Sequence, residues 1–126
     1  MTKIMIVDDS LRARCALKAL MSQQAGINVT AEAPNGQEAI QSINKQKPDL
    51  VLMDIRMPVM DGLEATRRLR ADPRHAHLPI IAMTANALAD DREVCLAAGM
   101  TDYITKPISM QTMVQAMSRH LAGRPP

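Results

Sequence analysis

The sequence predicts an α/β fold in which strands and helices alternate, with five of each. Short runs of consecutive apolar residues recur along the chain, and segments with the apolar spacing of a helix lie between them and after the last one. Continuous apolar runs are typical of strands that are covered on both faces, as in a parallel sheet. A strand followed by a helix, repeated in this way, predicts a parallel sheet with right-handed crossovers and helices on both faces.

The strands are predicted from three strong runs and two weaker ones. The strong runs cover residues 4–7, 51–53 and 80–83, while residues 28–33 and 102–104 are weaker candidates. Ligands of open parallel sheets bind beyond the carboxyl ends of the strands, so these ends are the places where functional residues are expected.

The helices are predicted from apolar residues that recur at intervals of three and four. The residues that trace these faces are Ala13, Ala16, Leu17, Leu20 and Met21 in the first helix, Ala39, Ile40 and Ile43 in the second, Leu63, Thr66 and Leu69 in the third, Leu88, Asp91, Cys95 and Ala98 in the fourth, and Met110, Met113, Val114, Met117 and Leu121 in the fifth. Ser109 is predicted to cap the start of the fifth helix. Gly26 and Gly99 are predicted to end the first and fourth helices.

The composition indicates one domain with an aliphatic core. Of the 126 residues, 47% are hydrophobic, yet the chain has one Tyr and no Phe or Trp. The 11 Met residues are therefore expected to fill the space that aromatic rings fill elsewhere. The net charge of +2 is too small to indicate a nucleic-acid-binding protein, and no basic stripe is present.

The two cysteines, Cys15 and Cys95, lack the spacing of metal ligands or of a CxxC pair, which favours a reducing compartment. No stretch has the length and apolar character of a signal peptide or a membrane span, so a cytoplasmic protein is expected. Cys15 lies opposite the apolar stripe of the first predicted helix and is expected to face solvent. Cys95 lies on the stripe of the fourth and is expected to be buried.

Polar side chains stand at the ends of four predicted strands. Asp8 and Asp9 follow the first, Asp54 ends the third, Thr84 ends the fourth and Lys106 follows the fifth. Alone, each would more often be a turn, cap or loop residue. The carboxyl ends of parallel strands meet at one edge of a sheet, however, so we expect these side chains to lie together in one pocket.

Three carboxylates in one pocket require compensating positive charge. Two unit charges about 5 Å apart repel by roughly 3 kcal/mol at an effective dielectric constant of about 20. The site must therefore take up protons, bind a cation or admit the Lys106 ammonium. A ligand set made only of oxygens favours Mg²⁺ or Mn²⁺ over zinc, and Mg²⁺ commonly combines a few carboxylates with waters and a phosphate oxygen.

This combination of groups favours phosphoryl transfer, which depends mostly on positioning and on charge neutralisation. Asp54 is the best candidate for a carboxylate nucleophile that forms an aspartyl phosphate, because it stands alone on the central run. Asp8 and Asp9 would hold the metal. Lys106 would neutralise one phosphoryl oxygen as a point charge, and Thr84 would donate its hydroxyl to another.

Four stretches resemble the receiver domain of two-component response regulators, and the resemblance covers nearly the whole chain. They are "VDDS" at residues 7–10, "DLVLMDIRMPVMDGLEA", "PIIAMTANA" and "AGMTDYITKPI". The last two are most similar to receivers of hybrid sensor kinases. The opening "DDSLRARCALKALM" is equally similar to a stand-alone or transcription-linked receiver.

The resemblance implies a flavodoxin-like fold, a (βα)5 three-layer sandwich with strand order 2-1-3-4-5. Residues 1–122 would form the receiver domain, and residues 123–126 would form a C-terminal tail or linker stub. The bond between Lys106 and Pro107 is expected to be cis, which agrees with the restriction of cis peptide bonds to proline.

The resemblance also implies a metal-dependent signalling role rather than that of an enzyme. Asp54 would accept a phosphoryl group from a phosphohistidine of a histidine kinase or phosphotransfer protein. Asp9 and Asp54 would bind Mg²⁺ directly, Asp8 through water and Arg56 through its backbone carbonyl. Arg56 and Asn86 fall at positions that vary in the family and tune the lifetime of the phosphoryl group.

The same resemblance implies a switch. Thr84 and Tyr103 match the switch pair of the family, and Lys106 matches its lysine. A downstream effector or a second copy of the chain would bind the face formed by the fourth helix, the fifth strand and the fifth helix. No direct contact with nucleic acid or membrane is expected of this domain.

Two other functions stay open from the sequence alone. Phosphatases of the haloacid-dehalogenase type also use an aspartyl nucleophile, but they need a second acid two residues later, where this chain has Arg56. A pseudo-receiver would be a binding module that is never phosphorylated, and the full set of strand-end residues counts against it.

Overall fold

The central sheet has five parallel strands in the order β2-β1-β3-β4-β5, as the resemblance implies. The computed structural model describes residues 2–84, 89–106 and 108–121. The strands are β1 (Thr2–Val7), β2 (Ile27–Ala33), β3 (Leu50–Asp54), β4 (Ile80–Thr84) and β5 (Asp102–Thr105). The helices are α1 (Leu11–Met21), α2 (Gly36–Gln46), α3 (Gly62–Arg70), α4 (Ala89–Ala98) and α5 (Met110–Leu121). The predicted α/β fold is confirmed, with each strand extended by one or two residues.

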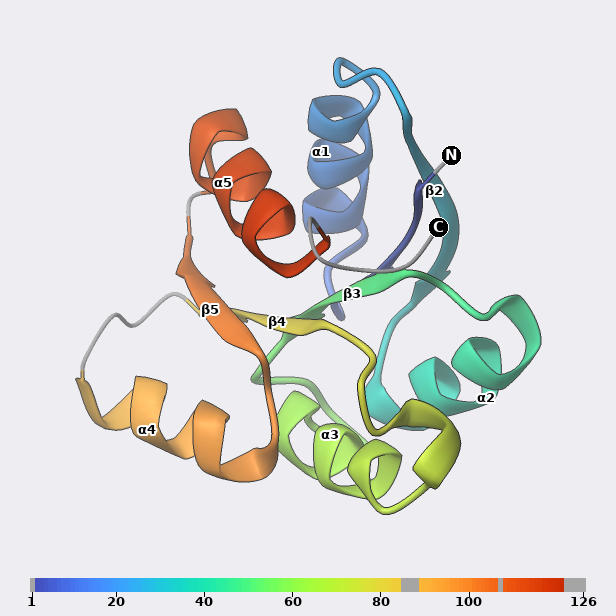
Figure 1. Ribbon diagram of the computed structural model, residues 1–126, viewed down its shortest axis with the longest axis vertical. Helices are drawn as coiled ribbons and strands as arrows, with labels where there is room; N and C mark the ends of the chain where they lie inside the picture. Colours follow the sequence, from blue (N-terminus) through green and yellow to red (C-terminus); the bar gives the residue numbers. More distant parts are fainter. Residues whose placement is uncertain (1, 85–88, 107, 122–126) are drawn as a thin grey trace.

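Helices cover the sheet on both faces, so the molecule has three layers (Figure 1). α1 and α5 lie on one face, and α2, α3 and α4 lie on the other. Because successive strand residues point to opposite faces, the core divides into two aliphatic clusters. Met53 belongs to the cluster under α2 and α3, whereas its neighbour Leu52 belongs to the cluster under α1 and α5. This arrangement is the flavodoxin-like sandwich.

The core is rich in methionine, as the composition predicts. Methionine side chains fill irregular spaces because they are unbranched and flexible. The buried ones are Met5, Met21, Met53, Met83, Met100, Met113 and Met117.

Side-chain caps fix the starts of several helices. The residue just before each of the first three helices is an N-cap: Ser10 for α1, Asn35 for α2 and Asp61 for α3. Each of these side chains accepts a hydrogen bond from the backbone amide three residues later. Ser109 accepts a bond of 3.1 Å from the amide of Thr112, which confirms the predicted cap of α5. Such caps satisfy amides that lack a partner within the helix. They also hold the loops that leave the carboxyl edge of the sheet.

The two predicted helix-ending glycines have different outcomes. Gly99 follows the last residue of α4 with φ +106°, as predicted. The prediction for Gly26 is wrong, because α1 already ends at Met21 and Ser22 closes its last turn by donating its amide to the carbonyl of Lys18. Gly26, with φ +85°, instead turns the chain into β2. A left-handed turn favours glycine wherever it occurs, so the residue type alone does not locate the helix end.

A short 3-10 helix, η1 (Pro73–His75), lies between α3 and β4, and the apolar patterns do not predict it. Asp72 caps it, so the Asp-Pro pair at its start was the available signal. Arg70 connects η1 to the loop after α4, because Nη1 donates to the His75 carbonyl at 2.7 Å and Nε donates to the Gly99 carbonyl at 2.8 Å.

Several sequence predictions concern parts of the chain outside the described residues. These are the role of Asn86, the placement of Leu88, the cis bond between Lys106 and Pro107, the tail at 123–126, and the side chains of Asp91 and Leu121. Within the described ranges, none of the helices combines the length and the apolar character that crossing a bilayer requires.

Candidate functional site

Three carboxylates meet at the carboxyl edge of the sheet. Asp8 and Asp9 follow β1 and Asp54 ends β3, and one oxygen from each lies within 4.8 Å of the others. Asp8 and Asp54 are buried, with exposures of 1% and 8%, whereas Asp9 is exposed. The sequence-predicted acids are therefore brought together.

Lys106 reaches this cluster from the end of β5. Its Nζ donates to Asp8 Oδ2 at 2.9 Å and lies 3.6 Å from Asp54 Oδ2. The other carboxylate oxygen of Asp8 accepts a bond of 2.9 Å from the amide of Ser10. The Lys106 ammonium therefore supplies positive charge to the acids, which is one of the three forms of compensation predicted from the sequence.

Burial and neighbouring charges set the protonation of this site. Burial has the largest effect on Asp54 and raises its pKa, and the charges of Asp8 and Asp9 raise it further. Lys106 and the backbone amide of Arg56 act in the opposite direction without cancelling the increase. Burial alone would lower the pKa of Lys106, but its hydrogen bond to Asp8 and the charges of Asp54 and Asp8 raise it overall. With three carboxylates beside one ammonium, the site keeps an excess of negative charge.

Thr84 and Tyr103 lie on the two strands beyond β3. Thr84 ends β4 with an exposure of 5%, and its carbonyl accepts a bond of 2.7 Å from the Lys106 amide. Tyr103 pairs with Ala82 across β4 and β5, and its side chain is partly buried against the cluster under α2 and α3. Thr84 thus lies at the same edge as the acids, and Tyr103 lies within the sheet, behind that edge.

The loop after Asp54 contributes main-chain groups. The backbone amide of Arg56 acts to lower the pKa of the Asp54 carboxyl, while Arg56 as a residue is exposed. A cavity of about 230 Å³ beside this loop is lined in part by Arg56, Asp61 and Thr84. Gly62, at the start of α3, lies directly on the Asp54 carbonyl, so a Cβ there would collide with that oxygen. The sequence places Gly62 in the segment that follows Asp54, but it does not predict this close contact.

Arg14 also contacts the site and Glu32 contacts Arg14, and sequence reasoning missed both. Arg14 Nη1 donates to the backbone carbonyl of Asp8 at 2.6 Å, and its Nε donates to Glu32 Oε1 at 3.1 Å. Lys18 donates to the other Glu32 oxygen at 2.7 Å. The hydrogen bonds from Lys18 and Arg14, together with their charges, outweigh burial and lower the pKa of Glu32. A bond to a main-chain carbonyl leaves no pattern in a sequence, so only the structure reveals this contact.

The donor set of the acidic cluster fits a hard divalent cation. All three side chains offer carboxylate oxygens, the ligands that Mg²⁺ and Mn²⁺ prefer. The Asp9 carboxylate makes no hydrogen bond or ion pair with the described parts of the chain, so it can turn toward a cation. Because three carboxylates face one ammonium, a bound cation would supply the remaining positive charge.

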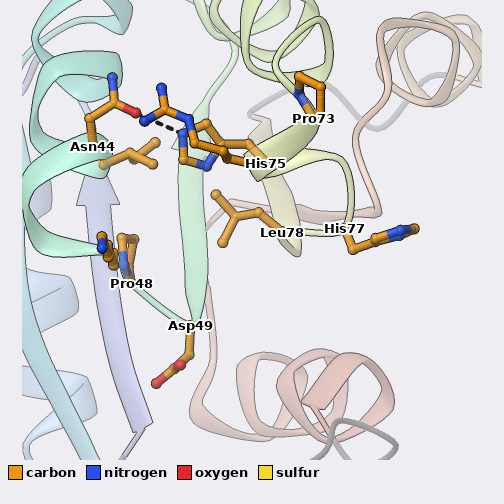
Figure 2. Close-up of a pocket in the computed structure, with 10 residues that line it drawn as sticks. Asn44, Pro48, Asp49, Pro73, His75, His77 and Leu78 are labelled. Atoms are coloured by element: carbon orange, nitrogen blue, oxygen red, sulfur yellow. Dashed lines mark hydrogen bonds between the residues drawn. The ribbon is translucent and has the colours of Figure 1, made fainter.

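A larger cavity of about 760 Å³ lies elsewhere, between the end of α2 and η1 (Figure 2). In Figure 2, Asn44 and His75 face each other at one end of it, with Asn44 Oδ1 2.7 Å from His75 Nε2. Asp49 accepts a bond of 2.8 Å from the Lys3 amide. These polar groups satisfy one another or the backbone, so the acidic cluster is the better candidate although the larger cavity lies elsewhere.

Known proteins resemble this chain over nearly its whole length. Residues 4–118 match the family described as Response regulator receiver domain. The chain is 36% identical to the polar-differentiation response regulator DivK of Brucella anthropi, with 94% of each chain covered. The crystal structure of the receiver domain of sensor histidine kinase PA1611 from Pseudomonas aeruginosa has a magnesium ion coordinated in its active site cleft. That structure is 38% identical, has a TM-score of 0.87, and is matched over 97% of this chain and 98% of its own.

The relatives differ greatly in length. The chain is 35% identical to probable histidine kinase 1 of Oryza sativa subsp. indica, yet it spans 15% of that protein. It spans 94% of DivK. Similar domains thus occur both as short proteins and as parts of long kinases. From the strand order and the match over residues 4–118, we conclude that the chain belongs to the family of response regulator receiver domains.

Proposed function

We propose that this receiver domain accepts a phosphoryl group on Asp54 from a phosphohistidine of a histidine kinase or phosphotransfer protein, with Mg²⁺ or Mn²⁺ as cofactor. The observation that carries the proposal is the position of Lys106 between Asp8 and Asp54, at 2.9 and 3.6 Å. The buried Asp54 carboxylate thus lies beside both the Lys106 ammonium and the oxygen ligands of the proposed metal site. The magnesium ion in the cleft of the PA1611 receiver supports the choice of cofactor.

In the proposed reaction, a carboxylate oxygen of Asp54 attacks phosphorus and the P–N bond of the phosphohistidine breaks. The electron pair of that bond returns to the imidazole nitrogen, which then takes up a proton. A bound divalent cation supplies positive charge that allows an anionic donor to approach. Asp9 and Asp54 would hold it directly, Asp8 would hold it through water, and Arg56 would contribute its backbone carbonyl.

Lys106 and Thr84 take the phosphoryl oxygens in this proposal. The Lys106 ammonium keeps its bond to Asp8 and pairs with one oxygen as a point charge. The Thr84 hydroxyl donates to another from the adjacent strand end. Transfer of this kind depends mainly on positioning and charge neutralisation, which these groups supply without covalent chemistry of their own.

The proposed output is a change of surface. The phosphoryl group adds roughly −1.5 to −2 charges, and Thr84 would move toward it. Tyr103 would then move to a more buried position and alter the face formed by α4, β5 and α5. Val94 and Leu96 on α4 are exposed apolar residues that a downstream effector or a second copy of the chain would cover.

We extend the proposal to the organisation of the chain. Residues 1–122 would act as the receiver domain and residues 123–126 as a tail or linker stub. Arg56 and Asn86 would tune the lifetime of the phosphoryl group. A cytoplasmic location fits the two cysteines, which are not joined by a disulfide.

Phosphorylation with acetyl phosphate tests this function. With Mg²⁺ present, intact mass should show one added phosphoryl group in the parent chain and none in Asp54→Asn. Asp49→Asn, which changes an acid at the opposite edge of the sheet, should be labelled like the parent. Excess chelator should abolish labelling, because the free site would repel an anionic donor. Equal labelling of Asp54→Asn, or full labelling in chelator, would exclude the proposed chemistry.

A further inference from the structure

We infer that Arg14 is a positioning residue for the metal site, acting on Asp9 through the peptide group that joins Asp8 to Asp9. The inference rests on the proposed function, because it concerns the cation that Asp8, Asp9 and Asp54 would hold. Arg14 does not touch that cation. Its effect would pass through the backbone of the loop between β1 and α1.

The backbone and side chain of Asp8 are fixed from several directions. Its amide donates to the carbonyl of Ala33 on β2 at 3.0 Å. Its carboxylate accepts bonds from Lys106 and from the amide of Ser10. The carbonyl is the remaining polar group, and Arg14 Nη1 holds it at 2.6 Å. Charge-assisted bonds of this length are among the strong ones.

The Asp8 carbonyl controls where Asp9 points. A peptide group is planar, so the carbonyl oxygen of Asp8 lies in one plane with the nitrogen and Cα of Asp9. Rotation of that plane would displace the Asp9 Cα and its side chain. The exposed Asp9 carboxylate has no hydrogen bond of its own to the described parts of the chain. Its direction in the free site therefore depends on the preceding peptide group.

Glu32 in turn orients Arg14. The Arg14 side chain retains 15% of its exposure and bonds to Glu32 Oε1 through Nε, while Nη1 faces Asp8. The guanidinium is a rigid planar fork, so the bond to Glu32 fixes the direction of Nη1. Arg14 thus connects α1, the end of β1 and β2. A lysine at position 14 has a single nitrogen and would not reproduce both contacts in this geometry.

Positioning and simple electrostatics predict opposite effects for a neutral residue at position 14. Arg14 carries positive charge close to the proposed cation, so its removal should tighten binding if charge alone mattered. If Arg14 instead holds Asp9 in place, its removal should weaken binding. Replacement of residues that orient metal ligands typically lowers metal affinity by roughly 10- to 100-fold.

The experiment compares cation affinity in matched variants, with Mn²⁺ measured directly by electron paramagnetic resonance and Mg²⁺ by competition. Arg14→Met should bind Mn²⁺ roughly tenfold more weakly than the parent, at the lower end of the range for such residues. Arg14→Lys should not restore the parent affinity, and Glu32→Gln should fall between parent and Arg14→Met. Arg12→Met is the matched control, because it removes the same charge from an exposed position of α1 and should bind at least as tightly as the parent.

Phosphorylation gives a second measurement that separates positioning from damage to the fold. At saturating Mg²⁺, the labelling rate of Arg14→Met with acetyl phosphate should return to that of the parent, because only the affinity for the cation is changed. If Arg14→Met proves too unstable to measure, Arg14→Lys takes its place in both assays, because it keeps the positive charge and should bind like the parent if charge alone mattered. Thermal melting and amide NMR spectra would show whether each variant is folded.

The outcomes separate this inference from the proposed function. If the parent binds Mn²⁺ and Asp9→Asn does not, the metal site is established. Parent-like or tighter binding by Arg14→Met, or parent-like binding by Arg14→Lys where Arg14→Met is too unstable, would then overturn the role of Arg14 alone. If the parent itself binds no divalent cation, the metal-dependent function fails, and the inference fails with it.

Discussion

Lys106 and Asp8 are 98 residues apart in the sequence, yet Lys106 Nζ lies 2.9 Å from Asp8 Oδ2. In the sheet order, β1 and β5 are separated by β3 and β4, so this pair bridges the edge over two strand ends. Asp8 is almost fully buried, at 1% exposure, while the Lys106 side chain keeps 28% of its exposure. The contact thus joins the two halves of the sheet at the site where we propose phosphorylation.

Removal of the Lys106 charge should destabilise the metal-free fold. In Lys106→Met the buried carboxylate of Asp8 would lose its cation, and we expect a loss of about 2–3 kcal/mol in the free energy of unfolding. This is less than for a fully buried pair because Lys106 is partly exposed. Urea unfolding in chelator measures it. Addition of Mg²⁺ should recover part of the loss, and Arg12→Met should stay within about 0.5 kcal/mol of the parent. An unchanged midpoint for Lys106→Met would contradict this expectation.

Asp54 should make stability depend on pH in a predictable direction. Its pKa is raised in the folded state, mainly by burial, so ionisation opposes folding. The penalty is absent below the ordinary Asp pKa and develops as pH rises through the ordinary and then the raised value. Asp54→Asn should therefore melt at a higher temperature than the parent at pH 7.5 in chelator.

The same comparison across pH and metal provides the controls for Asp54. The advantage of Asp54→Asn should shrink as the pH falls toward the ordinary Asp pKa. Saturating Mg²⁺ should also reduce it, because a bound ligand stabilises the folded parent. A variant that melts below the parent at every pH in chelator would show that the Asp54 charge does not oppose folding.

Gly62→Ala should damage both stability and phosphorylation. Its Cβ would collide with the Asp54 carbonyl and lie 3.1 Å from Met53 Cγ, so β3 and α3 would have to separate. Overpacking of this kind costs about 2 kcal/mol. Gly26→Ala is the matched control, since its Cβ would meet nothing within 4 Å and only the φ of +85° opposes it. Both variants should lose stability, but only Gly62→Ala should be labelled more slowly by acetyl phosphate; equal rates would argue against a role of this close approach.

The cysteines should differ sharply in reactivity. Cys15 is exposed on α1, and Cys95 is fully buried on α4, on the other face of the sheet. A thiol reagent should modify one equivalent rapidly under native conditions and the second only in denaturant. Cys15→Ser should abolish the rapid phase, while Cys95→Ser should retain it. Rapid modification of Cys95 would show that α4 opens readily.

Tyr103 offers a direct optical test of the proposed switch. The chain has no Trp or Phe and a single Tyr, so its fluorescence reports this residue. Beryllofluoride with Mg²⁺, a mimic of the phosphoryl group, should reduce access of a quencher to Tyr103. The change should weaken in Thr84→Ala. An unchanged signal, with occupancy of Asp54 shown independently, would separate Tyr103 from the switch.

The fold and the positions of the strand-end residues could be predicted, because parallel strands deliver their carboxyl ends to one edge whatever their separation in sequence. The exposure of Cys15 and the burial of Cys95 followed from helical phase in the same way. The roles of the site residues stay predictions. Contacts to main-chain atoms could not be predicted: Arg14 binds a carbonyl and Gly62 lies against one, and neither contact leaves a pattern of side-chain types.

The burial of β3 has a consequence for how the chain aligns as it folds. All five residues of this strand are buried, and apolar side chains cover both of its faces. In a strand with one solvent-exposed face, a register shift of one residue would expose its apolar side chains to water. In β3 both faces are buried, so the same shift would change the buried apolar area very little. Asp54 would oppose the shift, because the shift would move its carboxylate away from Lys106 and place another residue against Gly62. The acid that we propose to be phosphorylated would thus also select the alignment of the central strand, and its loss would leave misaligned folding less strongly opposed.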